Sequence, residues 1–154
     1  MNLKLKMILE AQRKHWNNVV LELLNGQKET HWCWYFLPNV PGLGTSDTAK
    51  AFAVTPEEFA EFMLNNEYAG NIHTVMFLID RAYRNSSVMS IQRVMGNNPV
   101  DVLKLKSFLT LYRDMICTDQ IETPDKPIAH ILLHSGAVYG SCRHTEETVL
   151  DYIS

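Results

Sequence analysis

The sequence predicts an all-α protein, a single compact helical domain of about six to eight helices that spans residues 1–154. Apolar residues recur at helical spacing along most of the chain, and residues typical of helix caps and turns separate these segments. No alternating strand pattern of any length occurs. With 154 residues, 46% of them hydrophobic, the chain is long enough to bury one core and needs no second domain.

The charge and cysteine content exclude several classes of protein. A formal net charge of −3 gives no basic footprint for long nucleic acid, and no apolar run approaches the ~18 residues that span a bilayer. Cys33, Cys117 and Cys142 are odd in number and lack a Cys-x-x-Cys pair, so we expect neither a disulfide framework nor a thiolate metal cluster. We therefore expect a protein of the reducing cytoplasm that binds neither long nucleic acid nor a membrane.

The first predicted helix starts near Leu5 and ends before Gly26, which is placed for a left-handed cap. Gln12 falls on its apolar face, and a buried amide there either satisfies a loop backbone or contacts a ligand. The aromatic segment 31–37 runs into Pro38 and Pro41, which favours irregular structure or a short helix.

Cap residues predict the next two helices. A short helix covers residues 48–52, and Thr45, Ser46 and Asp47 before it offer an oxygen-bearing cap. A second helix begins at Thr55, with proline at its first position and glutamate at its third. We expect this second helix to bury Phe59, Phe62, Met63 and Leu64.

Four further segments follow in the second half of the chain. A helix carrying Ile72 to Tyr83 closes at residues 85–87, and a shorter element covers residues 88–95. After a stop and a start at residues 96–99, another helix turns Leu105, Phe108, Leu109, Tyr112 and Ile116 to one face. A loop at 123–127 precedes an apolar run at 128–133, and Thr145 caps a last helix that holds Val149, Leu150 and Ile153.

Several motifs of this chain are shared with one family. The first half carries Ala11-Gln12, Leu21-x-x-Leu24-x-Gly26-x-Lys28, His31-Trp32-x-Trp34, Pro38 and Gly42-Leu43-Gly44-x-Ser46. The second half carries Asp101-x-x-Lys104-Leu105-x-Ser107-x-x-Thr110-Leu111 and Thr148-Val149-Leu150. In these motifs the chain resembles the bacterial family called domain of unknown function 1810, from about Ile8 to Ile153.

The resemblance implies a compact helical domain and little established chemistry. Where the family usually shows a His-Pro pair before a Leu-Gly-x-Arg-Leu stretch, residues 65–72 of this chain read Asn-Asn-Glu-Tyr-Ala-Gly-Asn-Ile. An anion contact made by that arginine is therefore not carried over to this chain. Phe108 and Leu109 also stand where small and methionine side chains are common in the family.

The polar motif residues and the aromatic rings beside them predict a ligand site. Lys104 and Ser107 lie one helical turn apart, and a cation and a hydroxyl on one side suit a phosphate. Backbone amides between Gly42 and Ser46 suit a second phosphate, and a tryptophan suits a stacked base. The predicted ligand-binding residues are Gln12, Lys28, His31, Trp32, Trp34, Gly42, Gly44, Ser46, Lys104, Ser107 and Thr110.

Each of these features also has a purely structural interpretation. Trp32 and Trp34 would fill a core, the two glycines would permit a tight turn, and Lys104 would pair with Asp101 on the surface. The sequence leaves both interpretations open, because a pocket requires these side chains to converge in space.

Motifs for metal binding or nucleophilic catalysis are weak. His130 and His134 have the spacing of two metal ligands on a helix, but the glutamate of the metalloprotease motif is missing. Cys33 lies two residues from His31, and residues two apart point in different directions. We therefore expect no metal and assign no catalytic residue.

The function expected from the sequence is non-enzymatic binding of a phosphorylated nucleotide, related to ADP-ribose or to a cyclic nucleotide signal, without a further cofactor. One alternative is an enzyme that cleaves an N-glycosidic or ADP-ribosyl bond, by analogy with the helical NAD and ADP-ribose (NADAR) proteins, with Asp101 or Glu67 as acid or base. Another is a protein-interaction module whose aromatic segment docks a partner or fills the core. The oligomeric state stays open.

Overall fold

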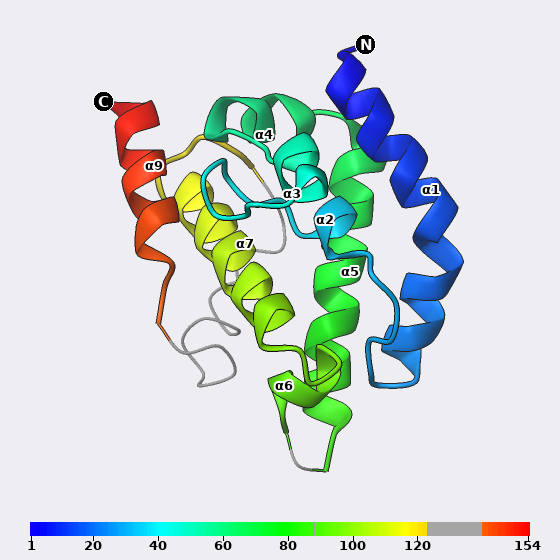
Figure 1. Cartoon of the computed structure of the whole chain (residues 1–154). Helices are drawn as coiled ribbons and strands as arrows, with labels where there is room; N and C mark the ends of the chain where they lie inside the picture. Colours follow the sequence, from blue (N-terminus) through cyan, green and yellow to red (C-terminus); the bar gives the residue numbers. More distant parts are fainter. Residues whose placement is uncertain (88, 123–139) are drawn as a thin grey trace.

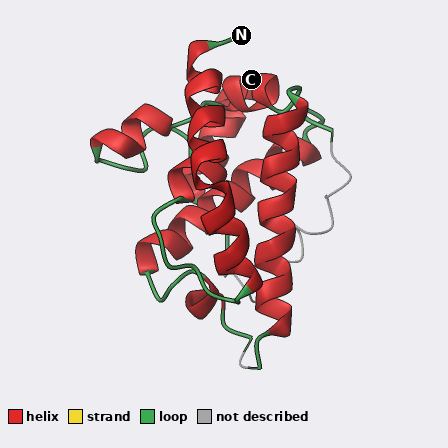
Figure 2. Cartoon of the chain, turned by 90° about the vertical axis from the view of Figure 1, so that its right-hand side faces the viewer, coloured by secondary structure: helices red, strands yellow, loops and turns green. Residues whose placement is uncertain are grey.

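The computed structural model describes residues 1–87, 89–122 and 140–154. Within them it contains eight helices and no strand, so the all-α prediction is confirmed (Figures 1 and 2). The helices are α1 (Leu3–Leu24), α2 (Cys33–Phe36), α3 (Asp47–Phe52), α4 (Pro56–Phe62), α5 (Asn66–Asn85), α6 (Ile91–Val94), α7 (Pro99–Cys117) and α9 (Arg143–Ile153).

The short helix α2 connects the two halves of the helix packing. The long helices α1 and α5 pack along each other, and α7 packs along α9 on the opposite side of the molecule (Figure 1). Helix α2 contacts α1, α3, α5 and α7. The aromatic segment that the sequence singled out is therefore central to the fold, and Trp32 and Phe36 are fully buried there.

Helix α1 has a defined cap at each end. The Asn2 side chain accepts the Leu5 N–H at 3.1 Å. At the other end, the N–H groups of Gly26 and Gln27 donate back into the last turn, and Gly26 has the predicted left-handed conformation with φ at +86°. The buried residues of this helix are Leu5, Ile8, Leu9, Gln12, Val19, Glu22 and Leu23.

The predicted cap of α4 is confirmed, and of the three residues that could cap α3, Ser46 does so, with α3 beginning at Asp47. The Ser46 hydroxyl accepts the Ala49 N–H at 3.1 Å. At the start of α4, the Thr55 hydroxyl accepts the Glu58 N–H at 3.1 Å, and the Glu58 carboxylate accepts the Thr55 N–H at 3.0 Å. This reciprocal pair satisfies two N–H groups that have no partner inside the helix.

Helix α4 ends earlier than the sequence predicts, and α6 is shorter than the predicted element. Leu64, predicted to be buried, is 84% exposed, because α4 ends at Phe62 and Leu64 lies in the following turn. The element predicted over residues 88–95 is a single helical turn, α6, with Ser90 as its cap. Residue 88 lies outside the described residues.

Helix α9 begins two residues before the predicted cap, at Arg143, so Thr145 lies inside its first turn and is fully buried. Only Val149 of the three predicted core residues is buried, and Leu150 and Ile153 face away from the core. The loop at 123–127 and the apolar run at 128–133 lie outside the described residues.

The segment between α1 and α2 is held by a buried carboxylate. Glu22 accepts the N–H groups of Glu29 and Thr30 at 2.6 and 2.8 Å, the Thr30 hydroxyl at 2.6 Å and the Trp32 Nε1 at 3.1 Å. Burial acts to raise the pKa of Glu22, but these hydrogen bonds together lower it below its ordinary value. The ionised carboxylate therefore fixes Trp32 in the core.

A buried ion pair joins the same segment to α7. Lys28 Nζ lies 2.8 Å from Asp101 Oδ2, outside hydrogen-bond geometry, and about 95% of each side chain is buried. The Lys28 N–H also donates to the Val94 carbonyl at 2.7 Å.

None of the helices in the described part of the chain is long and apolar enough to cross a membrane.

Candidate functional site

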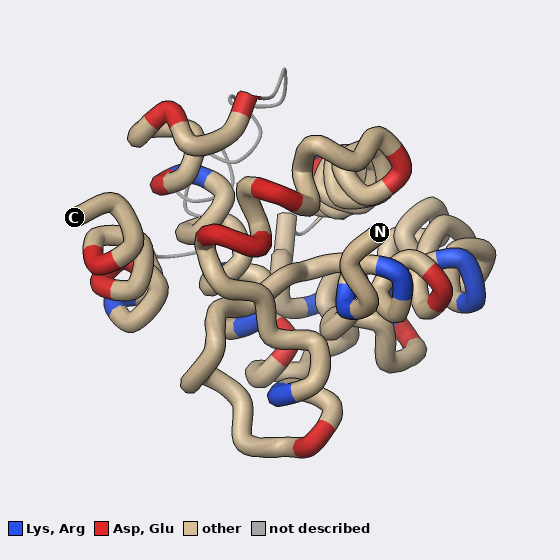
Figure 3. The backbone as a smooth tube through the Cα atoms, turned by 90° about the horizontal axis from the view of Figure 1, so that it is seen from above, with Lys and Arg blue, Asp and Glu red and all other residues tan. Residues whose placement is uncertain are grey.

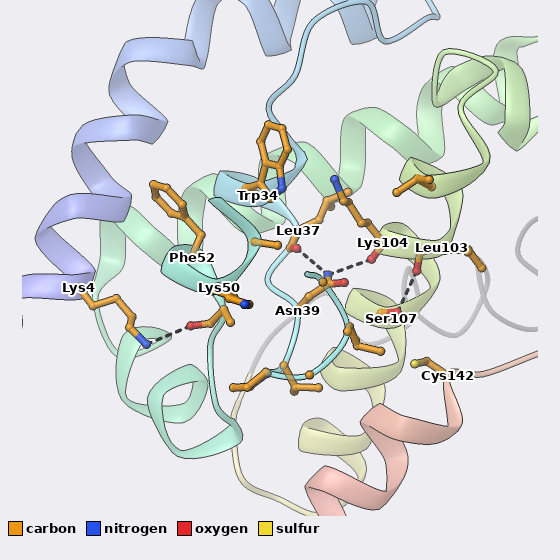
Figure 4. Close-up of a pocket in the computed structure, with 18 residues that line it drawn as sticks. Lys4, Trp34, Leu37, Asn39, Lys50, Phe52, Leu103, Lys104, Ser107 and Cys142 are labelled. Atoms are coloured by element: carbon orange, nitrogen blue, oxygen red, sulfur yellow. Dashed lines mark hydrogen bonds between the residues drawn. The ribbon is translucent and has the colours of Figure 1, made fainter. Parts of the chain in front are cut away.

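A pocket of about 430 Å³ lies between α3 and the loop 37–44 on one side and α7 on the other (Figure 4). Helix α1 contributes Lys4, and Cys142 contributes from the start of α9. The volume falls in the range of small-molecule sites, roughly 300–1,000 Å³. Apolar side chains form most of the lining, among them Leu37, Val40, Leu43, Phe52, Val100 and Leu103.

Trp34 and Lys104 form the most distinctive contact of the pocket. Lys104 Nζ lies 4.4 Å from the centroid of the Trp34 ring, a cation–π contact. The same ammonium group lies 3.6 Å from Asp101 Oδ1, farther than Lys28 lies from that carboxylate. Lys104 is thus a half-buried cation that stands over an aromatic ring and is only partly neutralised.

Two further lysines line the pocket. Lys4 is neutralised, because its ammonium group lies 2.9 Å from Glu58 and donates to the Ala53 carbonyl at 3.0 Å. The Lys50 side chain is exposed and makes no hydrogen bond or ion pair with another described residue. Acidic and basic residues are both distributed along the whole chain (Figure 3). Among the described residues that line the pocket, however, none is Asp or Glu. The pocket lining is therefore positive.

Asn39 fixes the loop that forms one wall of the pocket. Its Nδ2 donates to the carbonyls of Leu37 at 2.9 Å and Lys104 at 3.2 Å (Figure 4). Its own carbonyl accepts the Val54 N–H at 2.9 Å. The loop is therefore tied both to α7 and to the segment after α3, and this defines the pocket shape.

Ser107 and Cys142 form the polar end of the pocket beside α9. The Ser107 hydroxyl donates to the Leu103 carbonyl at 2.9 Å, and the Thr145 hydroxyl donates to the Cys142 sulfur at 3.2 Å. Burial acts to raise the pKa of Cys142, but hydrogen bonds with Ser107, Thr145 and two backbone N–H groups lower it below its ordinary value overall.

Gly42 and Gly44 let the pocket loop pass close to two helices. Gly42 has φ at +97°, and a Cβ there would lie 3.0 Å from the His144 ring, whose Nε2 donates to the Pro41 carbonyl at 2.8 Å. A Cβ at Gly44 would overlap the side chain of Ala49 in α3. Both glycines therefore have a structural role in addition to lining the pocket.

Five of the eleven residues predicted to bind a ligand line this pocket, and they come from α2, the glycine loop and α7. These five are Trp34, Gly42, Gly44, Lys104 and Ser107.

Three of the other six are buried with partners in the core. Gln12 is fully buried, where its Nε2 donates to the Tyr35 carbonyl and its Oε1 accepts from Asn71, each at 2.8 Å. Trp32 donates to Glu22, and Lys28 pairs with Asp101 as described above. The structural interpretation of these three residues accounts for every contact they make.

The remaining three also lie outside the lining. His31 is exposed, with its ring centroid 6.3 Å from that of Trp34. Ser46 caps α3 and does not line the pocket, although Gly42 and Gly44 of the same predicted phosphate-binding segment do. Thr110 is fully buried and accepts the Cys142 N–H at 2.9 Å, which attaches the start of α9 to α7.

The carboxylates considered as catalytic groups do not line the pocket. Asp101 is buried beside Lys28, and Glu67 is exposed on α5, where it accepts hydrogen bonds from Arg13 at 2.7 and 2.9 Å. Burial raises the pKa of the Cys33 thiol far above its ordinary value. His130 and His134 lie outside the described residues, within which no three His, Cys, Asp or Glu side chains gather to hold a metal.

Sequence reasoning did not select Lys4, Asn39, Lys50 or Cys142. Lys4 lies one turn before the core residue Ile8, so its place on the inner face of α1 could have been found from helical spacing. The other three come from separate segments that only the fold brings together. No local pattern distinguishes Lys50 from an ordinary surface lysine.

A family model described as "Protein of unknown function (DUF1810)" matches residues 2–126. No curated protein matches the chain. Among solved structures, the crystal structure of the conserved hypothetical protein Rv1873 from Mycobacterium tuberculosis is similar, with 27% sequence identity and a TM-score of 0.73. The similarity covers 93% of this chain and 94% of that one. The family model covers most of the sequence and includes every lining residue of the pocket except Cys142. The chain therefore belongs to the family of proteins of unknown function DUF1810.

Proposed function

We propose that the protein binds a phosphorylated nucleotide-type small molecule, related to ADP-ribose or a cyclic nucleotide, in the pocket between α3 and α7. The observation that carries this proposal is a largely apolar cavity with an indole ring in its lining, whose charged lining groups in the described residues are all lysines. An apolar wall with aromatic side chains suits a base, and ammonium groups suit a phosphate.

The two requirements of such a ligand are met at neighbouring positions. Trp34 and Phe52 lie at the same end of the pocket, where a flat base packs against aromatic surface (Figure 4). Lys104 covers one face of the Trp34 ring, so a phosphate that pairs with Lys104 places the attached nucleoside beside the indole. Stacking of a base on an aromatic side chain contributes about 1–3 kcal/mol.

Capture of an intact ligand fits this site better than turnover. The carboxylates weighed as acid or base, Asp101 and Glu67, lie outside the lining, and binding needs no general base. None of the three cysteines forms a disulfide, which supports our proposal that the protein acts in the reducing cytoplasm.

Calorimetric titration with ADP-ribose, NAD, cyclic AMP and cyclic di-AMP tests the proposal directly. We expect saturable binding of at least one nucleotide, a raised melting temperature, and recovery of the intact ligand after heat denaturation. Recovery of a cleaved product would favour the enzyme instead. Absence of binding by all four and by the matching guanine nucleotides would contradict the proposal and leave a protein-interaction role.

Substitution of Trp34 separates a binding role from a structural one. Trp34→Ala should weaken nucleotide binding by about 1–3 kcal/mol, since it removes the stacking surface. Because Trp34 is half-buried, circular dichroism should show a folded protein. Lys14→Ala, an exposed lysine of α1 outside the pocket, is the control and should leave binding unchanged. If Trp34→Ala binds like the wild type, the base does not pack on this ring.

A further inference from the structure

From the charges around the pocket we infer that its ligand carries two phosphate groups, one bound by Lys104 on α7 and the other by Lys50 on α3. A nucleotide with two phosphates, such as ADP-ribose or a cyclic dinucleotide, has this chemistry, whereas a mononucleotide does not. The inference rests on the proposed function and specifies how many anionic groups the proposed ligand carries.

The first excess positive charge lies at Lys104. Lys28 and Lys104 share the single carboxylate of Asp101, at 2.8 and 3.6 Å. Two ammonium groups and one carboxylate leave one positive charge in excess. Of the two lysines, Lys28 is buried beside the carboxylate, while Lys104 is farther from it and lines the pocket. The excess charge is therefore available to a ligand at Lys104.

The second excess positive charge lies at Lys50. This lysine lines the pocket and pairs with no described residue, including Asp47 one turn earlier in α3. Lys4, the third lysine of the lining, is neutralised by Glu58 at 2.9 Å. The described lining thus offers two uncompensated cations and no carboxylate.

The two cations lie on different walls of the pocket. Lys104 belongs to α7, whereas Lys50 belongs to α3, and Figure 4 shows them on separate sides of the cavity. A single phosphate at Lys104 leaves Lys50 without a partner. A second phosphate gains that interaction, which at an exposed lysine corresponds to about a two- to fivefold gain in affinity.

Calorimetric titration of adenosine, cyclic AMP, AMP, ADP-ribose and cyclic di-AMP measures this dependence, with the matching guanine compounds as a second series. We expect the two-phosphate ligands to bind most tightly. AMP carries nearly two charges on one phosphate, so it separates total charge from the number of anionic groups. Comparing ADP-ribose with cyclic di-AMP distinguishes adjacent phosphates from phosphates held apart by a ring.

Lys50→Ala gives the decisive comparison. It should lower affinity for the better two-phosphate ligand about two- to fivefold and leave cyclic AMP and adenosine unchanged, because these do not reach Lys50. Lys104→Met should weaken every phosphorylated ligand but not adenosine. Lys14→Ala should change none of them. Lys50 and Lys104 are both at least partly exposed, so the variants should fold like the wild type.

The two proposals fail in different ways. If nucleosides and nucleotides bind but cyclic AMP equals the two-phosphate ligands, or if Lys50→Ala affects all ligands alike or none, the two-phosphate inference is wrong and nucleotide binding stands. If no compound of either series binds the wild type, both proposals are wrong.

Discussion

The Asp101 carboxylate is almost completely buried between α7 and the segment that precedes α2. Lys28 at 2.8 Å and Lys104 at 3.6 Å are the cations that offset the loss of hydration of this carboxylate, and the buried Cys33 thiol is a further partner. A buried ion pair of this kind adds little net stability compared with apolar residues of the same size. Removing one partner nevertheless destabilises the fold strongly, because the other charge stays buried. The pair therefore sets how the segment before α2 meets α7, and with it the position of Lys104 in the pocket.

Replacing Lys28 should expose this cost. Lys28→Met should lower the free energy of unfolding by about 3–5 kcal/mol, since it removes the nearer cation and leaves the buried carboxylate with the more distant Lys104. Urea denaturation measures the change. The double variant Lys28→Met with Asp101→Asn should recover part of the loss, and Lys14→Met, on the surface, should stay within about 0.5 kcal/mol of the wild type. Equal losses for Lys28→Met and Lys14→Met would contradict the buried pair.

The difference between Trp32 and Trp34 shows what the sequence predicts poorly at this scale. Two residues apart in one motif, Trp32 is fully buried against Glu22, whereas Trp34 lines the pocket. Both rings fit either role by residue type. The role of each ring depends on the direction in which it points from α2, and on which helices, distant in the sequence, pack on that side.

At the scale of elements, local chemistry explains the helix boundaries that were predicted well. The caps at Ser46 and Thr55 and the stop at Gly26 need only neighbouring residues, so the sequence contains their whole explanation. The start of α9 was placed too late because its first turn depends on Thr110 in α7, which accepts the Cys142 N–H. A contact between distant segments leaves no local pattern.

The connection from α1 to α2 should be sensitive to pH through Glu22. Its pKa in the folded state is lower than in the unfolded chain, so the ionised carboxylate stabilises the fold above the unfolded pKa, about 4.3. This contribution is lost as the pH falls from that value through the lower pKa of the folded state.

Comparison with Glu22→Gln isolates this contribution. The variant should unfold more easily than the wild type at pH 7, by about 1–3 kcal/mol, since an amide is a weaker acceptor for the Trp32 and Thr30 donors. Urea denaturation across a pH series should show the two proteins converging below pH 4. A constant difference across the series would contradict the lowered pKa.

At the scale of the whole molecule, α2 should couple the unfolding of the two halves. Because α2 contacts α1 and α5 as well as α7, neither half keeps its packing when the other unfolds. We expect a single transition in urea, with tryptophan fluorescence and circular dichroism giving the same midpoint. Separate midpoints would mean that the predicted single domain consists of two independently stable parts.

The pocket is also a property of the whole molecule, which is why the sequence identified only part of it. Trp34, Lys104 and Ser107 were found because they belong to polar and aromatic motifs. Lys50 and Cys142 could not be found in this way, because they reach the pocket only after α3 and the start of α9 have packed.

The position of Trp34 provides an intrinsic fluorescence signal with which the proposed ligand binding can be measured. The chain has three tryptophans. Trp32 is buried in the core and Trp16 packs against the core from α1, so Trp34 is the indole that lines the pocket. Emission from that ring should change when a base or a phosphate displaces Lys104 from its face, while the other two indoles provide a constant background. In Trp34→Phe the same background remains and the response disappears, so occupancy of the pocket becomes readable without any added dye.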